Sequence, residues 1–201
     1  ENWSRRPRDK VCCNPMVVLC RTPMSTDIPL LVGAGSVPEL RMREAAEALA
    51  RLWSLPLQTH ATGASPASVL TETEPGLIRL SGDPARQRPD GGHWLDALAD
   101  WRRPLLLLVP GETDGSVSGQ AAAYAALCHQ LGAPLRGLIQ IQGSWNQEQR
   151  QRDGLLWCGW IPARDDSAHA FQLDRLHLCL QRSGVMQTPT TAARGEAAAQ
   201  A

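Results

Sequence analysis

Five aliphatic residues in a row, bounded by a proline at each end, constrain the fold of this chain more than any other feature. The run is Leu105–Val109, between Pro104 and Pro110. A strand with one face in water alternates apolar and polar residues, whereas a continuous apolar run suits a strand that is covered on both faces. Such strands belong to parallel sheets, whose crossover connections place helices on each side. The run therefore predicts a central strand of an α/β domain.

The segments around this run alternate between strand-like and helix-like patterns. Short apolar runs that end in glycine or proline predict strands, and apolar residues spaced by three and four predict helices. The alternation predicts a single α/β domain over 25–183, with a doubly wound, mostly parallel sheet of about six strands and helices on both faces. The other expected strands are 29–35, 55–60, 76–82, 137–143 and 157–161, and the expected helices are 36–53, 93–101, 118–131, 146–153 (a polar helix or turn) and 165–182.

Three stretches are expected to contribute no element to this domain. Residues 1–24 are taken as an upstream or processed extension, and 63–74, rich in Ser, Thr and Ala, is predicted to be a loop. Residues 184–201 are predicted to form a disordered tail, because they offer no periodic apolar residues to a core. Within the helices, Ser36 is expected to cap the first one, and Phe171 is expected to face the core from the last one.

The charge balance excludes two classes of partner. Twenty lysines and arginines offset twenty acidic residues among 201, and the pI is about 7.2. A protein that binds nucleic acid needs a surplus of cations to displace counterions from the phosphates, so no nucleic-acid partner is expected. A polybasic membrane patch is excluded in the same way, and no apolar run approaches the roughly 18 residues of a spanning helix.

The cysteines indicate free thiols in a reducing compartment. None forms a Cys-x-x-Cys pair, and no neighbouring histidine completes a zinc-type spacing, so no metal site is expected. A chain of this size needs no disulfide framework, which favours a cytoplasmic location. The six cysteines are Cys12, Cys13, Cys20, Cys128, Cys158 and Cys179.

The turn after the first expected strand lies where a mononucleotide-binding fold holds phosphate. It reads Gly33-Ala34-Gly35-Ser36 and lacks the Gly-Lys-Ser/Thr of a phosphate-binding loop, because Lys10 is the only lysine of the chain. Glu39 adds a negative charge nearby, and Pro38 stands where a dinucleotide-binding motif needs its third glycine. An ordinary strand-to-helix turn is the simplest interpretation, with a ligand site at Gly33, Gly35 and Ser36 as the alternative.

A second polar turn, 111–119, follows the central strand and opens a helix. Free backbone N–H groups at such a helix start can hold an anion, with Gly115 and Ser116 as candidates. Glu112 and Asp114 could act as bases or ligands. The serines could instead cap the helix. Farther on, Trp145 in a loop could stack on a ligand ring, although a place in the core is the simpler interpretation.

The order of motifs over 76–162 resembles that of dethiobiotin synthetases. A Pro-Leu-Leu-Leu-Leu-Val strand leads into a Gly-rich loop and an Ala-rich helix, followed by a Gly-x-Pro-x-x-Gly strand and a closing Gly-x-Ile-Pro strand. The segments that carry the resemblance are Leu77–Gly82, Asp90–Trp101, Pro104–Val109, Gly115–Leu131, Gly132–Ile139 and Gly159–Pro162.

The resemblance implies an ATP-dependent ligase of biotin biosynthesis that uses ATP and Mg²⁺ and forms homodimers. It also implies that Gln140 or Gln142 would stand where that family reads the adenine edge. The chain departs from the family in its chemistry: both phosphate-binding lysines are absent, and Ser81 replaces a strand-end acid. The leading interpretation is a divergent protein without ATP-driven ring closure that binds a small molecule or a protein partner. An active enzyme with an atypical or truncated nucleotide site is the alternative.

A second resemblance points to a different class of enzyme. The stretch Pro104–Asp114 is similar to the strand and acid-bearing turn of α/β-hydrolases, which would make Asp114 the acid of a catalytic triad. Such enzymes need a Gly-x-Ser-x-Gly nucleophile turn earlier in the chain, and none is present. The later histidines that could complete a triad are His129 and His169.

Overall fold

The computed structural model describes residues 28–71 and 76–185, and these residues form six strands and six helices. Every pair of neighbouring strands in the sheet is parallel, and the strand order is β2-β3-β1-β4-β5-β6. The prediction of a doubly wound α/β fold is confirmed. In chain order the elements are β1 (Leu30–Gly33), α1 (Glu39–Trp53), β2 (Leu57–Ala61), α2 (Pro66–Leu70), β3 (Leu77–Ser81), α3 (Trp94–Asp100), β4 (Leu105–Pro110), α4 (Gln120–Leu131), β5 (Leu135–Ile141), α5 (Gln147–Arg152), β6 (Trp157–Ile161) and α6 (His169–Arg182).

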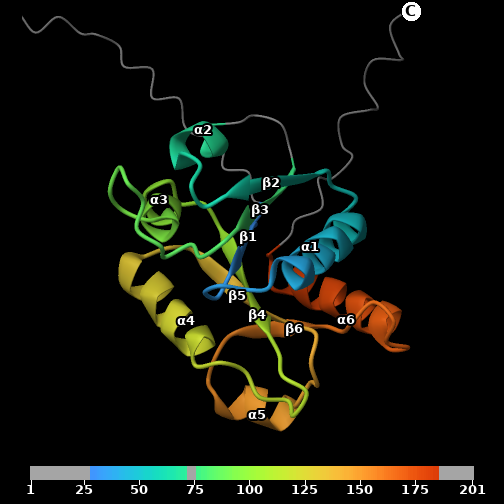
Figure 1. The fold of residues 1–201 in the computed structure, drawn as a ribbon. Coiled ribbons are helices and arrows are strands. Elements are labelled where there is room, and N and C mark those ends of the chain that lie inside the picture. The colour runs from blue at the N-terminus through green and yellow to red at the C-terminus, as the bar shows by residue number, and fades with distance from the viewer. Residues whose placement is uncertain (1–27, 72–75, 186–201) are drawn as a thin grey trace, which may run out of the picture.

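Helices lie on both faces of the sheet (Figure 1), and the sheet separates two apolar cores. On one face, β4 side chains such as Leu105 and Leu107 pack with buried residues of α2, α3 and α4, including Trp94. On the other face, Leu106 and Leu108 pack with buried residues of α1 and α6. Successive side chains of one strand therefore enter different cores, which explains why β4 is apolar at every position.

The chain reverses direction across the sheet beside β1. From β1 it passes over β3 to reach β2, and from β3 onward it moves past β1 toward β4, β5 and β6. Right-handed crossovers in opposite directions place helices on opposite faces, in agreement with the two cores. In open α/β sheets the ligand crevice forms at the carboxyl ends of the strands where this reversal occurs. The turn after β1 occupies that position.

Three local predictions were wrong. Helix α1 begins at Glu39 after Pro38, and no side chain caps it, so Ser36 stays in the preceding turn. A short helix, α2, lies inside the stretch predicted as a loop, because Pro66 starts a turn whose Val69 finds a place in the core. Phe171 is 61% exposed, since the inward face of α6 is filled by Leu176 and Leu180.

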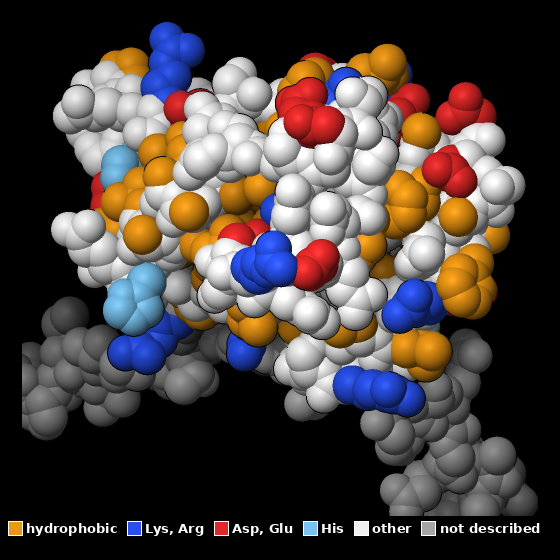
Figure 2. Space-filling view, turned by 90° about the horizontal axis from the view of Figure 1, so that it is seen from below, with side chains coloured by type: hydrophobic (Ala, Val, Ile, Leu, Met, Phe, Trp, Pro, Cys, Tyr) orange, Lys and Arg blue, Asp and Glu red, His pale blue; other side chains and the backbone are white. Residues whose placement is uncertain are grey.

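The limits of the predicted domain fall close to the described residues. Val185 is buried at 2% exposure, so the core extends to this residue. The predicted extension 1–24 and residues 186–201 of the predicted tail lie outside the described residues. In the part of the chain that is described, no helix is long and apolar enough to cross a membrane. On the side where α5 lies, acidic and basic side chains are interspersed and form no patch of one sign (Figure 2).

Candidate functional site: the strand ends beside β1

The turn after β1 is closely packed by its neighbours. The side chain of Val37 lies against Gly33, and Gly35 adopts a positive φ of 83°. A Cβ atom at Gly35 would lie 2.7 Å from Oε1 of Gln120, so the first side chain of α4 rests directly on this turn. The positive φ favours glycine at position 35.

Glu39 turns its carboxylate toward the end of β3. Its Oε1 atom lies 2.7 Å from Nη1 of Arg79, and its Oε2 atom accepts a hydrogen bond of 2.8 Å from the Ser81 hydroxyl. Burial alone would raise the pKa of Glu39, but the hydrogen bond from Ser81 and the charge of Arg79 outweigh it and hold that pKa below its usual value. Glu39 is therefore a carboxylate at neutral pH, fixed in the first turn of α1.

Arg79 is the buried half of this ion pair. It belongs to β3, the strand next to β1, and is only 3% exposed. Its Nε atom lies 3.4 Å from the Thr59 hydroxyl. A buried guanidinium needs an anion beside it, because transfer of an unpaired charge from water is costly. Glu39 supplies that anion from within the chain.

The electrostatics of the turn follow from these contacts. In a phosphate-binding loop, backbone N–H groups and a lysine ammonium surround the anion. Here the predicted ligand residues Gly33, Gly35 and Ser36 lie in the turn just before Glu39, whose carboxylate belongs to the first turn of α1. The local cation, Arg79, already carries an anionic partner.

Asp83 and Tyr124 form a second contact near the end of β3 that the sequence did not single out. The Tyr124 hydroxyl donates a hydrogen bond to Oδ1 of Asp83, which also accepts one from the backbone N–H of Ala85 at 2.9 Å. Burial and the neighbouring carboxylate raise the pKa of Tyr124 far above its usual value. Asp83 thus ties α4 to the loop after β3. The signal in the sequence was the Ser-Gly-Asp-Pro turn.

The loop after β4 is closed on itself by its own backbone. Gly111 and Val117 form an isolated antiparallel bridge, and the Glu112 N–H donates to the Ser116 carbonyl. Oδ1 of Asp114 accepts a hydrogen bond of 2.8 Å from the Ser116 N–H, and the contact with Ser116 holds the pKa of Asp114 below its usual value. The predicted candidates Glu112 and Asp114 are both exposed.

Gly115 is buried at the inner side of this loop. Its carbonyl accepts a hydrogen bond of 2.5 Å from Nη2 of Arg150, and Nη1 of Arg150 lies 3.1 Å from Oδ2 of Asp153. Arg150 also lies over the ring of Trp157, at 4.9 Å from its centroid. The loop is therefore held in place by α5, an interaction that sequence reasoning missed because α5 reads as a polar surface helix.

The two predicted glutamines point to different places. Gln140 is fully buried, and its amide nitrogen donates to the carbonyls of Gln142 and Ser144 at 3.1 and 2.9 Å, so it shapes the turn after β5. The Gln142 amide nitrogen instead donates to Oε2 of Glu44 on α1 at 3.0 Å. The predicted stacking residue, Trp145, packs edge-on against Trp157, with ring centroids 6.1 Å apart. Trp145 is partly buried and belongs to neither apolar core, so nothing here tests its role as a stacking residue.

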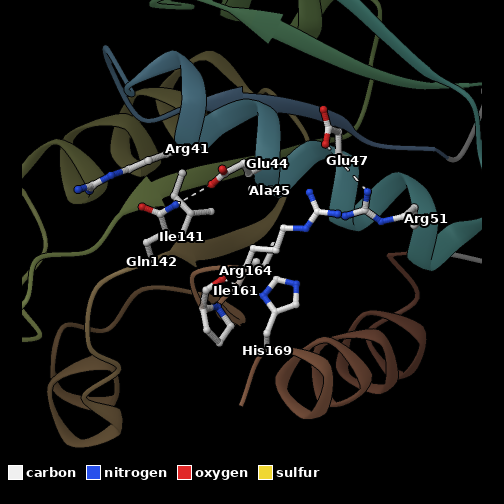
Figure 3. Close-up of a pocket in the computed structure, with 11 residues that line it drawn as sticks. Arg41, Glu44, Ala45, Glu47, Arg51, Ile141, Gln142, Ile161, Arg164 and His169 are labelled. Carbon is white, nitrogen blue, oxygen red and sulfur yellow. Dashed lines mark hydrogen bonds and ion pairs between the residues drawn. The ribbon is translucent and has the colours of Figure 1, made fainter. Parts of the chain in front are cut away.

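Gln142 borders a small pocket between α1 and the ends of β5 and β6 (Figure 3). Its apolar floor includes Ile141 and Ile161, and Arg164 and His169 reach it from the chain after β6. Nδ1 of His169 forms a hydrogen bond with the Pro162 carbonyl at 3.0 Å. Of the candidates for a catalytic triad, His169 is thus hydrogen-bonded at this pocket, and Asp114 is hydrogen-bonded to Ser116.

The strand ends thus bring the candidate residues together in two groups. Gly33, Gly35 and Ser36 lie at the β1 turn with Glu39 and Arg79, while Glu112–Ser116 lie against the turn after β5. Within residues 28–71 and 76–185, no three His, Cys, Asp or Glu side chains are arranged to hold a metal ion. Comparison with known protein families and with curated proteins found no match to this chain.

Proposed function

We propose that this protein is a divergent dethiobiotin-synthetase-like domain in which an internal ion pair has taken the place of the phosphate site. In this proposal the chain does not carry out ATP-driven ring closure and serves as a binding domain for a small molecule or a protein partner. The observation that carries the proposal is the Glu39 carboxylate, held by Arg79 and Ser81 in the first turn of α1.

The physical argument concerns charge. ATP bound at the β1 turn would bring its phosphates close to the Glu39 carboxylate, and like charges at short range repel. The lysine ammonium that the family uses is absent here, and the nearby cation is the guanidinium of Arg79, which is already paired with Glu39. An ammonium and a guanidinium are not equivalent in shape or hydration. Gln120 further fills the space over Gly35.

The strand order adds support at the level of the fold. The reversal beside β1 is the position at which mononucleotide-binding α/β proteins hold their ligand, so the scaffold agrees with the resemblance over 76–162. Fold alone does not fix an activity, and the chemistry of the turn argues against the ligase. The free thiols of Cys128, Cys158 and Cys179 agree with the proposed cytoplasmic location.

The test is a calorimetric titration of the full chain with MgATP, together with complementation of a biotin auxotroph. We expect no heat of binding at millimolar nucleotide and no growth. The matched variants are Glu39→Gln, which removes the charge from the turn, and Glu47→Gln, which removes a carboxylate farther along the same helix. Binding of MgATP by the unmodified chain, or growth of the auxotroph, would show that the nucleotide site is intact and would refute the proposal.

A further inference from the structure

The strand β6 forms one edge of the sheet (Figure 1). A groove of about 570 Å³ borders this strand. One wall carries Trp145, Arg150 and Trp157, and the other carries Gln172, Arg175 and Cys179 of α6. The outward N–H and C=O groups of an edge strand have no partner in their own sheet. The groove therefore exposes a row of main-chain hydrogen-bonding groups between two side-chain walls.

This edge carries few of the devices that usually protect a sheet edge: its pairing with β5 has one register irregularity and Pro162 follows it, but no residue of β6 is charged. Charged side chains, prolines or polar residues blunt most such edges. β2, at the opposite edge, is preceded by Pro56 and carries Gln58 and His60, whereas β6 reads Trp-Cys-Gly-Trp-Ile and has no charge and no proline. Gly159 in its middle lacks a side chain that could hinder an approaching backbone.

The surroundings of the groove are also apolar. Among the large hydrophobic side chains that are exposed in the described part of the chain, Leu156 lines the groove and is 63% exposed. Phe171 and Leu178, 61% and 50% exposed, belong to α6, the helix that also supplies the groove residue Arg175. Phe171, Arg175 and Leu178 follow the three-to-four spacing of one helix face. A large apolar patch around an open edge marks an interaction site.

Charge indicates what kind of partner the groove fits. Among the described residues, the charged ones that line it are both arginines, Arg150 and Arg175. Arg150 already pairs with Asp153 and donates to the Gly115 carbonyl. Arg175 lies over the Phe171 ring at 5.9 Å, and no carboxylate of the described residues pairs with it. An acidic side chain on the partner would complete this site.

We propose that the β6 edge binds an extended peptide segment of a partner protein, which adds a seventh strand to the sheet. Main-chain hydrogen bonds to β6 would supply affinity, and alternate side chains would supply specificity. Because successive side chains of a strand point to opposite faces, apolar residues would contact Trp145 and Trp157, and a carboxylate at the intervening positions would meet Arg175. This inference goes beyond the proposed function and stands without it, since it involves no residue of the β1 turn.

The probe is a capped heptapeptide of alternating valine and glutamate, titrated into the full chain by calorimetry. The controls are the same peptide with lysine in place of glutamate, and one with alternate peptide nitrogens methylated. We expect the glutamate peptide to bind about fivefold more tightly than the lysine peptide, the effect of one surface charge pair. Methylation should abolish binding if the peptide pairs with β6.

The paired variants are Arg175→Glu and Arg182→Glu, both on α6. The first should reverse the preference toward the lysine peptide, and the second, in the last turn of the helix, should leave it unchanged. Equal binding of all three peptides, or no binding at millimolar peptide, would overturn the proposal. Sedimentation that shows a dimer to which the glutamate peptide does not bind would overturn it in favour of a second copy of this chain at the groove. MgATP titration of the same sample keeps this result separate from the proposed function.

Discussion

Nη1 of Arg79 lies 2.7 Å from Oε1 of Glu39, and this ion pair joins the interior of β3 to the first turn of α1. Arg79 is buried and its partner is half exposed, so the arginine depends on the glutamate more than the reverse. Removal of the partner of a buried charge leaves that charge uncompensated. The same contact therefore bears on both the stability of the fold and the chemistry of the β1 turn.

Substitution of Glu39 by glutamine should lower the free energy of unfolding by about 1–3 kcal/mol, because Arg79 loses its anion and keeps only neutral partners. Urea unfolding at neutral pH measures the change. The control is Glu47→Gln on the same helix, whose exposed ion pairs with Arg43 and Arg51 are long. It should cost no more than about 0.5 kcal/mol. Equal losses in the two variants would contradict a special role for the Glu39 pair.

The same carboxylate predicts a dependence of stability on acid pH. The pKa of Glu39 is lower in the folded protein than the value of 4.5 expected for an unpaired glutamate. Its stabilising contribution is therefore complete above the unfolded pKa and is lost as the pH falls through the folded pKa. Urea midpoints measured from pH 7 down to acid should fall more for the unmodified chain than for Glu39→Gln. Parallel curves would show that another group dominates the acid response.

Arg150→Met should destabilise the protein by about 2–3 kcal/mol, because a buried guanidinium then no longer bonds the Gly115 carbonyl and Asp153. Its neighbour Arg152 provides the control, since its ion pair with Glu148 is exposed. Arg152→Met should change stability by less than about 0.5 kcal/mol. Thermal unfolding of the two variants gives the comparison, and similar midpoints would mean that Arg150 does not anchor the loop after β4.

Gly143→Ala should be much more harmful than Gly132→Ala. Both glycines have positive φ, so an alanine is strained at either position. A Cβ atom at Gly143 would also press on the backbone of Gly111 and lie 2.6 Å from the Glu112 carbonyl, whereas nothing lies within 4 Å of one at Gly132. The extra crowding should cost about 1–3 kcal/mol. Denaturant unfolding distinguishes the two, and equal effects would mean that the two strand-end turns separate easily.

The three cysteines of the described residues, Cys128, Cys158 and Cys179, should react in a fixed order. Burial raises the pKa of Cys128 to about 11, and burial together with Cys179 raises that of Cys158 to about 12. Cys179 is only partly buried. Since the thiolate is the reactive form, iodoacetamide at mildly alkaline pH should label Cys179 well before the other two. Peptide mapping by mass spectrometry follows the order, and all three should react in denaturant. Early labelling of Cys128 in the native protein would contradict the packing of α4.

The sequence by itself determined the fold class and the order of its strands. The continuous apolar run of β4 predicts burial on both faces of the strand. Such a run can be recognised from local residue types alone. The start of α1 was misplaced because Ser36 offers a cap that the turn does not use. Phe171 was misplaced because helical periodicity specifies an apolar face without specifying what that face packs against.

Only the tertiary structure decided the state of the candidate site. Glu39 and Arg79 are forty residues apart in the chain, and nothing in either segment announces that they form an ion pair. Likewise, the hydrogen bonds from Tyr124 to Asp83 and from Arg150 to Gly115 join segments that are far apart in the sequence. The sequence could show that the turn lacks a lysine, because an absent side chain needs no geometry. Which carboxylate occupies the turn depends on how the strands align, and that alignment is set by the packing of the whole sheet.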